Sequence, residues 1–169
     1  MGLADAFAQE LEQEAKTTRR VLERVPSDRF AWKPHDKSMT LGKLAMHVAE
    51  VPGTISAWAL KDVMEFSAQP QENLPKSTGD LLAAHDASLA KAKQVLQQLG
   101  DAGLQQKWEG KAGGQTLLAL PKLALIRSVL LNHWIHHRGQ LSVYLRLLDV
   151  PVPSIYGPSA DENPFAARP

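Results

Sequence analysis

Apolar residues recur at intervals of three and four in four segments of the chain, which is the pattern of amphipathic helices. The first segment places Leu3, Phe7, Leu11, Thr18, Leu22 and Val25 on one side, and Pro26 ends it. Thr40 is a good N-cap for the second segment. We therefore expect helices at about residues 3–25, from Thr40 through Trp58, 79–99 and 121–149. No segment shows a convincing strand alternation.

Proline and glycine mark where these helices bend or end. Pro52-Gly53 should kink the second helix without stopping it, because the apolar stripe resumes on the same side. Gly100 should stop the third helix. The glycine-rich segment 101–116 reads as an ordered loop with, at most, a short extended piece, and the tail 151–169 holds five of the eleven prolines. This predicts an all-α four-helix bundle as a single domain, residues 1–169, with a long loop before the fourth helix and an extended proline-rich C-terminal tail.

The fourth predicted helix carries three imidazoles in five residues, in the stretch HWIHHRGQ. At about 100° per residue, His133 and His137 fall in one stripe with apolar neighbours. The other members of this stripe are Ile126, Leu130, Leu141, Tyr144 and Leu148. Residues four apart on a helix lie about 5–6 Å apart at Cβ, so both rings can reach one metal ion. We expect this stripe to face the interior of the bundle.

The second predicted helix adds one histidine at an equivalent place. His47 lies in its stripe between Leu44 and Val51. Packing the two stripes together would bring His47 to His133 and His137. Burying three rings without partners would cost roughly a few kcal/mol each, whereas one divalent ion would satisfy all three. Three protein ligands also leave a coordination position open, as in catalytic metal sites.

The histidines have other interpretations besides metal binding. A single histidine facing a core is more often a hydrogen-bonded core residue than a ligand. His85, on the stripe of the third helix, is the strongest rival ligand, and His35 lies in a polar loop. His136 falls on a second apolar strip of the fourth helix, which we interpret as a homodimer contact or as a surface covered by the loop or tail. The other members of that strip are Leu125, Val129, Val143 and Leu147.

Two further residues are candidates for catalysis. Glu50, one turn after His47, could orient an imidazole or accept a proton from metal-bound water, although such a glutamate is commonly just solvated. Tyr156 in the tail could form part of a lid over the site. Gln140, at the edge of the histidine stripe, could hydrogen-bond a ligand, whereas Arg138 and Arg146 fall on the polar side and are expected to be surface charges.

Composition narrows the class of protein. The 169 residues hold 19 Lys and Arg against 18 Asp and Glu, and this net charge of +1 gives no support to nucleic-acid binding. There is no cysteine, so any thiol chemistry needs a thiol from a ligand. The N-terminal segment lacks the pattern of a secretory signal, and charged residues interrupt every apolar run before the ~20 residues of a membrane span. We expect a soluble, cytoplasmic protein.

Three stretches resemble one family. LGKLAMHVAEVPG around His47, NHWIHHRGQLSVYLR around the histidine pair and VPVPSIYGPSADE in the tail are similar to the DinB-like superfamily of metal-dependent enzymes. The resemblance covers nearly the whole chain, and His-x-x-x-His followed by Arg-Gly-Gln is its most specific part. It implies an up-up-down-down bundle, commonly dimeric, with a divalent metal held by His47, His133 and His137. Related branches include transferases and isomerases that use bacillithiol, mycothiol or glutathione.

Two functional hypotheses follow. In the first, the three histidines hold Zn²⁺, Ni²⁺ or Fe²⁺, and the ion activates water or a low-molecular-weight thiol to attack a small electrophilic substrate, as in a thiol S-transferase or a hydrolase. In the second, the protein is a non-catalytic dimeric module that binds a metal or another ligand. The sequence leaves open whether the protein is an enzyme.

Overall fold

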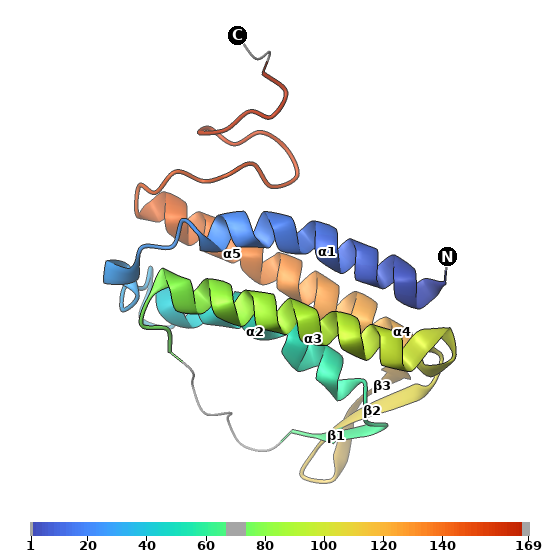
Figure 1. Ribbon diagram of the computed structural model, residues 1–169. Coiled ribbons are helices and arrows are strands. Elements are labelled where there is room, and N and C mark those ends of the chain that lie inside the picture. The colour runs from blue at the N-terminus through green and yellow to red at the C-terminus, as the bar shows by residue number, and fades with distance from the viewer. Residues whose placement is uncertain (1, 67–73, 167–169) are drawn as a thin grey trace.

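Long helices packed side by side form the body of the molecule (Figure 1). The computed structural model describes residues 2–66 and 74–166. Its helices are α1 (Leu3–Leu22), α2 (Leu41–Trp58), α3 (Thr78–Leu104), the short α4 (Lys122–Ala124) and α5 (Asn132–Leu147), with a 3₁₀ turn at Ser27–Arg29. A π-helical segment, Leu125–Leu131, joins α4 to α5, so these three pieces form one continuous rod. The four expected helices are therefore present, close to the expected bounds.

The four long helices run up-down-down-up, and not up-up-down-down as the family resemblance implied. Figure 1 shows α1 and α2 running in opposite directions, α2 and α3 running in the same direction, and α5 running back. α3 packs against both α1 and α2, and α5 lies across from α3 against α2 and α1. The contact between α2 and α5 is the one that carries the histidines.

A three-stranded mixed sheet lies beside the end of the bundle, and it makes the expected all-α class wrong. Its strands are β1 (Val63–Glu65), β2 (Lys107–Ala112) and β3 (Gln115–Pro121). They lie in the order β1-β2-β3, with β1 parallel to β2 and β2 antiparallel to β3. The segment 101–116, expected to be a loop, thus holds all of β2 and the start of β3.

The β2–β3 hairpin has a clear local cause. Gly113 and Gly114 form its two-residue turn and both have positive φ, 56° and 76°, as tight hairpin turns require. Trp108 on β2 is 1% exposed and stacks on Trp58 of α2, and its indole N–H donates to the Trp58 carbonyl at 3.1 Å. This contact fastens the sheet to the end of α2.

Helix α2 continues through Pro52, as expected, with help from a neighbouring helix. The buried Gly53 N–H donates to the Ser88 hydroxyl of α3 at 2.7 Å, and that hydroxyl donates to the Glu50 carbonyl at 3.0 Å. The two helices approach so closely here that a Cβ at Gly53 would lie 2.9 Å from Ser88 Cα. Ser88 therefore supplies hydrogen-bond partners to α2 on both sides of Pro52.

Arg138 is buried, so its expected place on the surface is wrong. Its guanidinium is 1% exposed and lies 2.6 Å from the Glu14 carboxylate of α1, with Thr18 at 3.1 Å. The buried side of α5 consists of Trp134, Arg138, Leu141 and Leu145. The expected orientation assumed a uniform α-helix with about 100° per residue from residue 121 onward. The π-helical segment before α5 has i→i+5 bonds and turns less per residue, so α5 is rotated relative to that expectation.

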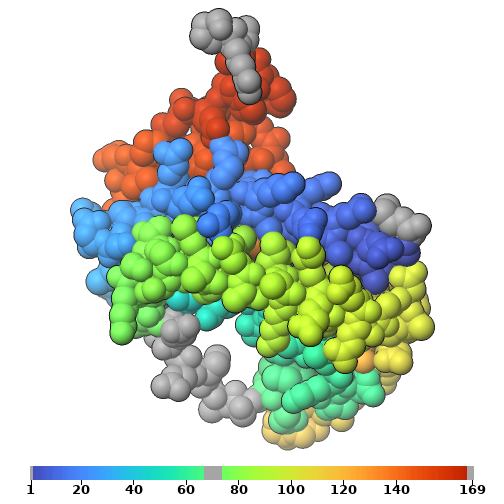
Figure 2. Space-filling model, in the orientation of Figure 1, coloured from blue at the N-terminus to red at the C-terminus, as the bar shows by residue number. Residues whose placement is uncertain are grey.

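The C-terminal tail has neither helix nor strand over its described part, as predicted, yet it is fastened to the bundle. The Tyr156 hydroxyl donates to Glu14 at 2.8 Å and accepts from Arg138 at 2.6 Å. Glu162 pairs with Arg20 of α1, and Asp161 pairs with Arg146 of α5. Figure 2 shows the described part of this tail projecting outward beyond α1, on the opposite side of the molecule from the sheet.

Replacing Ser88 by alanine tests whether its hydrogen bonds to Gly53 and Glu50 stabilise α2. Ser88→Ala leaves the buried Gly53 N–H without its acceptor, so we expect the free energy of unfolding to fall by about 1–2 kcal/mol. Urea denaturation measures this change. The exposed Ser128→Ala serves as the matched control, and equal stability of the two variants would contradict the bracing role of Ser88.

Candidate metal centre

The three histidines singled out in the sequence lie together at the contact between α2 and α5. His47 comes from α2, and His133 and His137 lie one turn apart on α5. The ring centroids are 5.1 Å apart for His47 and His133, 4.6 Å for His47 and His137, and 4.4 Å for His133 and His137. The Nε2 atoms of His47 and His133 are 2.9 Å apart. The expectation that these rings converge is confirmed.

The cluster lies at the edge of the helix contact and not in the middle of the core. All three histidines are half-buried, while Trp134 and Leu141 beside them on α5 are 0% exposed. The stripe with His133 and His137 was expected to face the interior of the bundle, whereas these two residues lie at the border of the buried face of α5. Their position leaves one side of the cluster accessible from outside the bundle.

The electrostatic environment keeps the three imidazoles neutral at pH 7. Burial lowers the pKa of His47 to about 4, and repulsion from protonated His137 and His133 acts in the same direction. Burial also lowers the pKa of His133 and of His137, with smaller contributions from neighbouring histidines, and at His137 the hydrogen bond to Gln140 partly opposes the shift. Neutral imidazole is the form that binds metals, because the ligating nitrogen must have a free lone pair.

Gln140 fixes the orientation of one ring. Its side-chain oxygen lies 2.7 Å from Nδ1 of His137, and because that oxygen can only accept, Nδ1 carries the proton. The lone pair of His137 is then on Nε2. Metal-binding histidines commonly donate their second N–H to such an acceptor. The sequence placed Gln140 near the site but did not identify this role.

The donor set fits a divalent transition metal ion. One nitrogen from each of the three histidines lies within 4.8 Å of the other two, comparable to the span of two metal–nitrogen bonds of about 2.0–2.1 Å. Imidazole nitrogens suit zinc, nickel, copper and iron alike. The arrangement can therefore hold one such ion through three protein ligands from two helices.

The candidate catalytic residues Glu50 and Tyr156, and the third histidine of α5, His136, have other surroundings. Glu50 is half-buried on α2, and its main-chain carbonyl accepts from Ser88. The Tyr156 hydroxyl is engaged with Arg138 and Glu14, on the side of α5 that faces α1. His136 is exposed and its ring centroid is 5.0 Å from that of His137. Catalytic roles for Glu50 and Tyr156 stay predictions.

The second strip of α5, expected as a homodimer contact, is only partly exposed. Val143 and Leu147 are each 57% exposed, whereas Leu125 is fully buried. The homodimer stays a prediction. Among residues 2–66 and 74–166, no helix is both long and apolar enough to cross a membrane.

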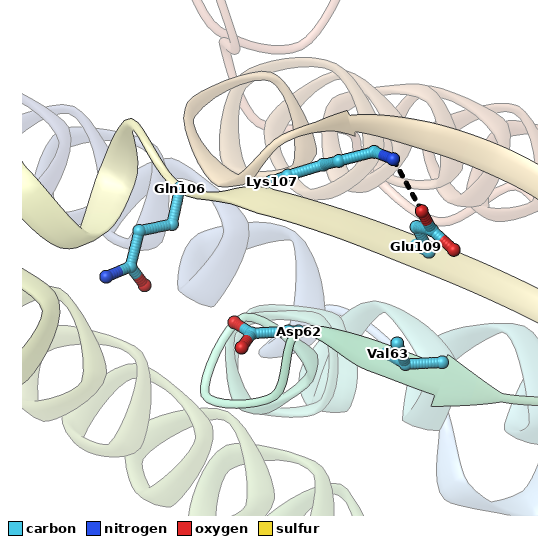
Figure 3. A pocket seen from close by; sticks show the side chains of 5 residues that line it. All are labelled: Asp62, Val63, Gln106, Lys107 and Glu109. Atoms are coloured by element: carbon cyan, nitrogen blue, oxygen red, sulfur yellow. Dashed lines mark ion pairs between the residues drawn. The ribbon is translucent and has the colours of Figure 1, made fainter.

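A pocket of about 370 Å³ lies apart from the histidines, where the sheet meets the end of α3 (Figure 3). Its lining residues are Asp62, Val63, Gln106, Lys107 and Glu109. Its charges are already paired, because Lys107 contacts Glu109 at 2.6 Å and Asp62 accepts from the buried Lys122 at 2.8 Å. We interpret this pocket as part of the sheet's attachment and not as the reactive site.

His85, the rival ligand, is a core residue of α3. It is 1% exposed, it packs against Trp134 with ring centroids 6.1 Å apart, and it is not a member of the three-histidine cluster. Within the described part of the chain its Nε2 has no hydrogen-bond partner. Burial lowers the pKa of His85, and the nearby Asp86 only partly opposes this. His85 therefore reduces the stability of the fold, more so in acid.

Replacing His85 by leucine tests this interpretation. Removing a buried nitrogen without a partner should raise the free energy of unfolding by about 1–2 kcal/mol at pH 7. Because the pKa of His85 is lowered in the folded chain, the unfolded chain takes up a proton there more readily, so the cost of burying His85 is smallest above pH 6.5 and grows as the pH falls. Urea denaturation with chelator at pH 7 and 5.5 should thus show a smaller loss in His85→Leu than in the unaltered chain. Exposed His35→Gln is the control, and an equal loss in all three proteins would contradict the assignment.

Comparisons with known proteins agree with this architecture. The chain matches the DinB family over residues 1–164. It is 30% identical over 161 residues to the uncharacterized protein YrdA of Bacillus subtilis (strain 168), covering 94% of this chain and 90% of YrdA. The Bacillus subtilis protein YjoA, also uncharacterized, is 26% identical over 136 residues, which is 76% of this chain and 80% of YjoA.

Two solved structures share the fold. A DinB-like protein from Bacillus cereus ATCC 10987 superposes with a TM-score of 0.71 at 22% identity, covering 90% of this chain and 97% of that one. The crystal structure of YjoA gives a TM-score of 0.66 at 22% identity, covering 85% and 92% of the two chains. Because the family match spans residues 1–164, nearly the full length, this chain belongs to the DinB family.

Proposed function

We propose that this protein is a metal-dependent enzyme whose single divalent ion is held by His47, His133 and His137. The observation that carries the proposal is the convergence of three imidazole nitrogens, one from each residue, within 4.8 Å of one another. Burial favours the neutral form of each ring, so the donors are ready to bind near pH 7.

The chemistry would be the activation of a small nucleophile. A divalent ion bound to three protein ligands supplies a Lewis acid that lowers the pKa of a water or thiol in the open position. The chain contains no cysteine, so a thiol nucleophile would come from a low-molecular-weight compound. Zn²⁺, Ni²⁺ and Fe²⁺ are all compatible with a set of imidazole ligands.

The residues of the chain divide the remaining tasks. Gln140 holds His137 with Nε2 available, and the buried flank of α5 keeps bulk water from the inner side of the cluster. The half-exposed outer side gives a small electrophilic substrate its approach. Glu50, one turn from His47, is the carboxylate best placed along α2 to accept a proton. Tyr156, held by Arg138 and Glu14, orders the start of the tail.

Elemental analysis of protein purified without a histidine tag tests the metal site. We expect about one transition metal ion per chain in the unaltered protein. His133→Ala and His137→Ala should each lose the ion with the helices still folded. Removing a ligand should weaken metal binding by more than the roughly 10–100-fold that is typical when a residue hydrogen-bonded to a ligand is removed. His136→Ala is the matched control and should keep the ion. Full metal occupancy in the double variant His133→Ala/His137→Ala would end the proposal.

Turnover separates an enzyme from a binding module. Conjugation of low-molecular-weight thiols to generic electrophiles, measured with and without chelator, should be chelator-sensitive and absent from His137→Ala. A large fall in melting temperature on chelation, with no turnover of any electrophile, would instead favour a non-catalytic metal-binding module.

A further inference from the structure

Trp134 directly follows the metal-ligand candidate His133 on α5 and is 0% exposed. Its indole N–H donates to the main-chain carbonyl of Val48 on α2 at 2.8 Å. Val48 directly follows His47, and Trp134 directly follows His133. This one hydrogen bond therefore joins the immediate neighbours of two histidines on opposite helices.

The Val48 carbonyl is available because of Pro52. In an α-helix the carbonyl of residue 48 accepts from the N–H of residue 52, and proline has no N–H. The next N–H, that of Gly53, donates to Ser88 of α3 at 2.7 Å. The proline thus leaves a buried carbonyl that must find a donor outside α2, and the indole of Trp134 supplies it.

Buried polar groups give this contact its strength. Val48, Pro52 and Trp134 are all buried, so water is not an alternative partner for either the carbonyl or the indole. A buried carbonyl without a partner costs about as much as a lost hydrogen bond, which favours one register of α5 against α2. A register shift of even one residue would separate His133 and His137 from His47.

We propose that Pro52 and Trp134 act together to position the metal ligands. Pro52 withholds the helical N–H, the Val48 carbonyl recruits the Trp134 indole, and the resulting bond sets His133 and His137 against His47. Trp134 is thus a positioning residue, and it does not touch the ion. This inference rests on the proposed metal site, and it adds that the affinity of that site is controlled from the core.

The alternative is that Trp134 only fills the core. Two substitutions distinguish these roles. Trp134→Phe keeps an aromatic ring and removes the N–H, so the Val48 carbonyl loses its donor. Adding Pro52→Ala returns an N–H at residue 52 to that carbonyl, which repairs the hydrogen bonding of α2 but does not restore the link to α5.

The experiment measures Zn²⁺ affinity by competition with a chromophoric chelator and stability by urea denaturation in chelator. Relative to the unaltered chain, Trp134→Phe should lower the urea midpoint and weaken Zn²⁺ binding by about tenfold. This is the lower end of the loss expected when a residue bonded directly to a metal ligand is removed, because Trp134 acts on the histidines through the main chain of Val48. Trp134→Phe/Pro52→Ala should recover the urea midpoint and keep the weakened binding. The visible spectrum of bound Co²⁺ should differ from that of the unaltered protein in both variants.

Trp108→Phe is the matched control. Trp108 is equally buried and also donates its indole N–H to a carbonyl of α2, that of Trp58, but it comes from the sheet. Trp108→Phe should lower the urea midpoint and leave the Zn²⁺ affinity and the Co²⁺ spectrum unchanged. If Trp134→Phe alone does not fold, the double variant, whose carbonyl has a donor, still gives the answer.

The outcomes separate this inference from the proposed function. Zn²⁺ binding by the unaltered chain together with unchanged affinity in Trp134→Phe would overturn the positioning role and leave the metal site intact. Recovery of affinity along with stability in the double variant would also overturn it, because the tryptophan would then act only through the fold. Absence of Zn²⁺ binding by the unaltered chain would overturn both proposals.

Discussion

The contact between α2 and α5 is the constraint on which the proposed metal site depends, because it brings the three histidines together. One histidine on α2 must meet two on α5, and no local feature of either helix can ensure that. The structure fixes the contact with buried groups, since the Trp134 indole bonds the Val48 carbonyl at 2.8 Å beside the histidines. On the other side of α2, Ser88 of α3 completes the hydrogen bonding around Pro52. The proline therefore gives α2 two polar connections to its neighbours that an uninterrupted helix would not make.

The depth of the histidine cluster suits the proposed metal chemistry. A cluster in the centre of the core would bind an ion with no route for a substrate, and a fully exposed cluster would leave the rings protonated in mild acid. Half-burial at the edge of the helix contact lowers the pKa of all three imidazoles, that of His47 to about 4, and leaves one side open. Neutral ligands and an open side are together what an activating metal centre needs.

The sequence predicted the local parts of the structure and missed those that depend on distant contacts. His133 and His137 are one helical turn apart, so spacing alone paired them, and the apolar stripe of α2 selected His47. The hairpin was missed although Gly113-Gly114 between two extended runs is a hairpin signal. Arg138 was wrongly predicted to lie on the surface, because a projection at a constant angle of about 100° per residue does not account for a π-helical segment. The role of Trp134 follows from the carbonyl freed by Pro52, which the sequence does contain, but the identity of its partner depends on the packing of α5.

The most direct measurement of the central claim is a crystal structure of the protein loaded with zinc, with anomalous diffraction recorded at the zinc edge. We expect one strong anomalous peak at about 2.0–2.1 Å from ring nitrogens of His47, His133 and His137, with the bond from Trp134 to Val48 in place. A peak held by His85 or His136, or three rings that do not share one ion, would contradict it.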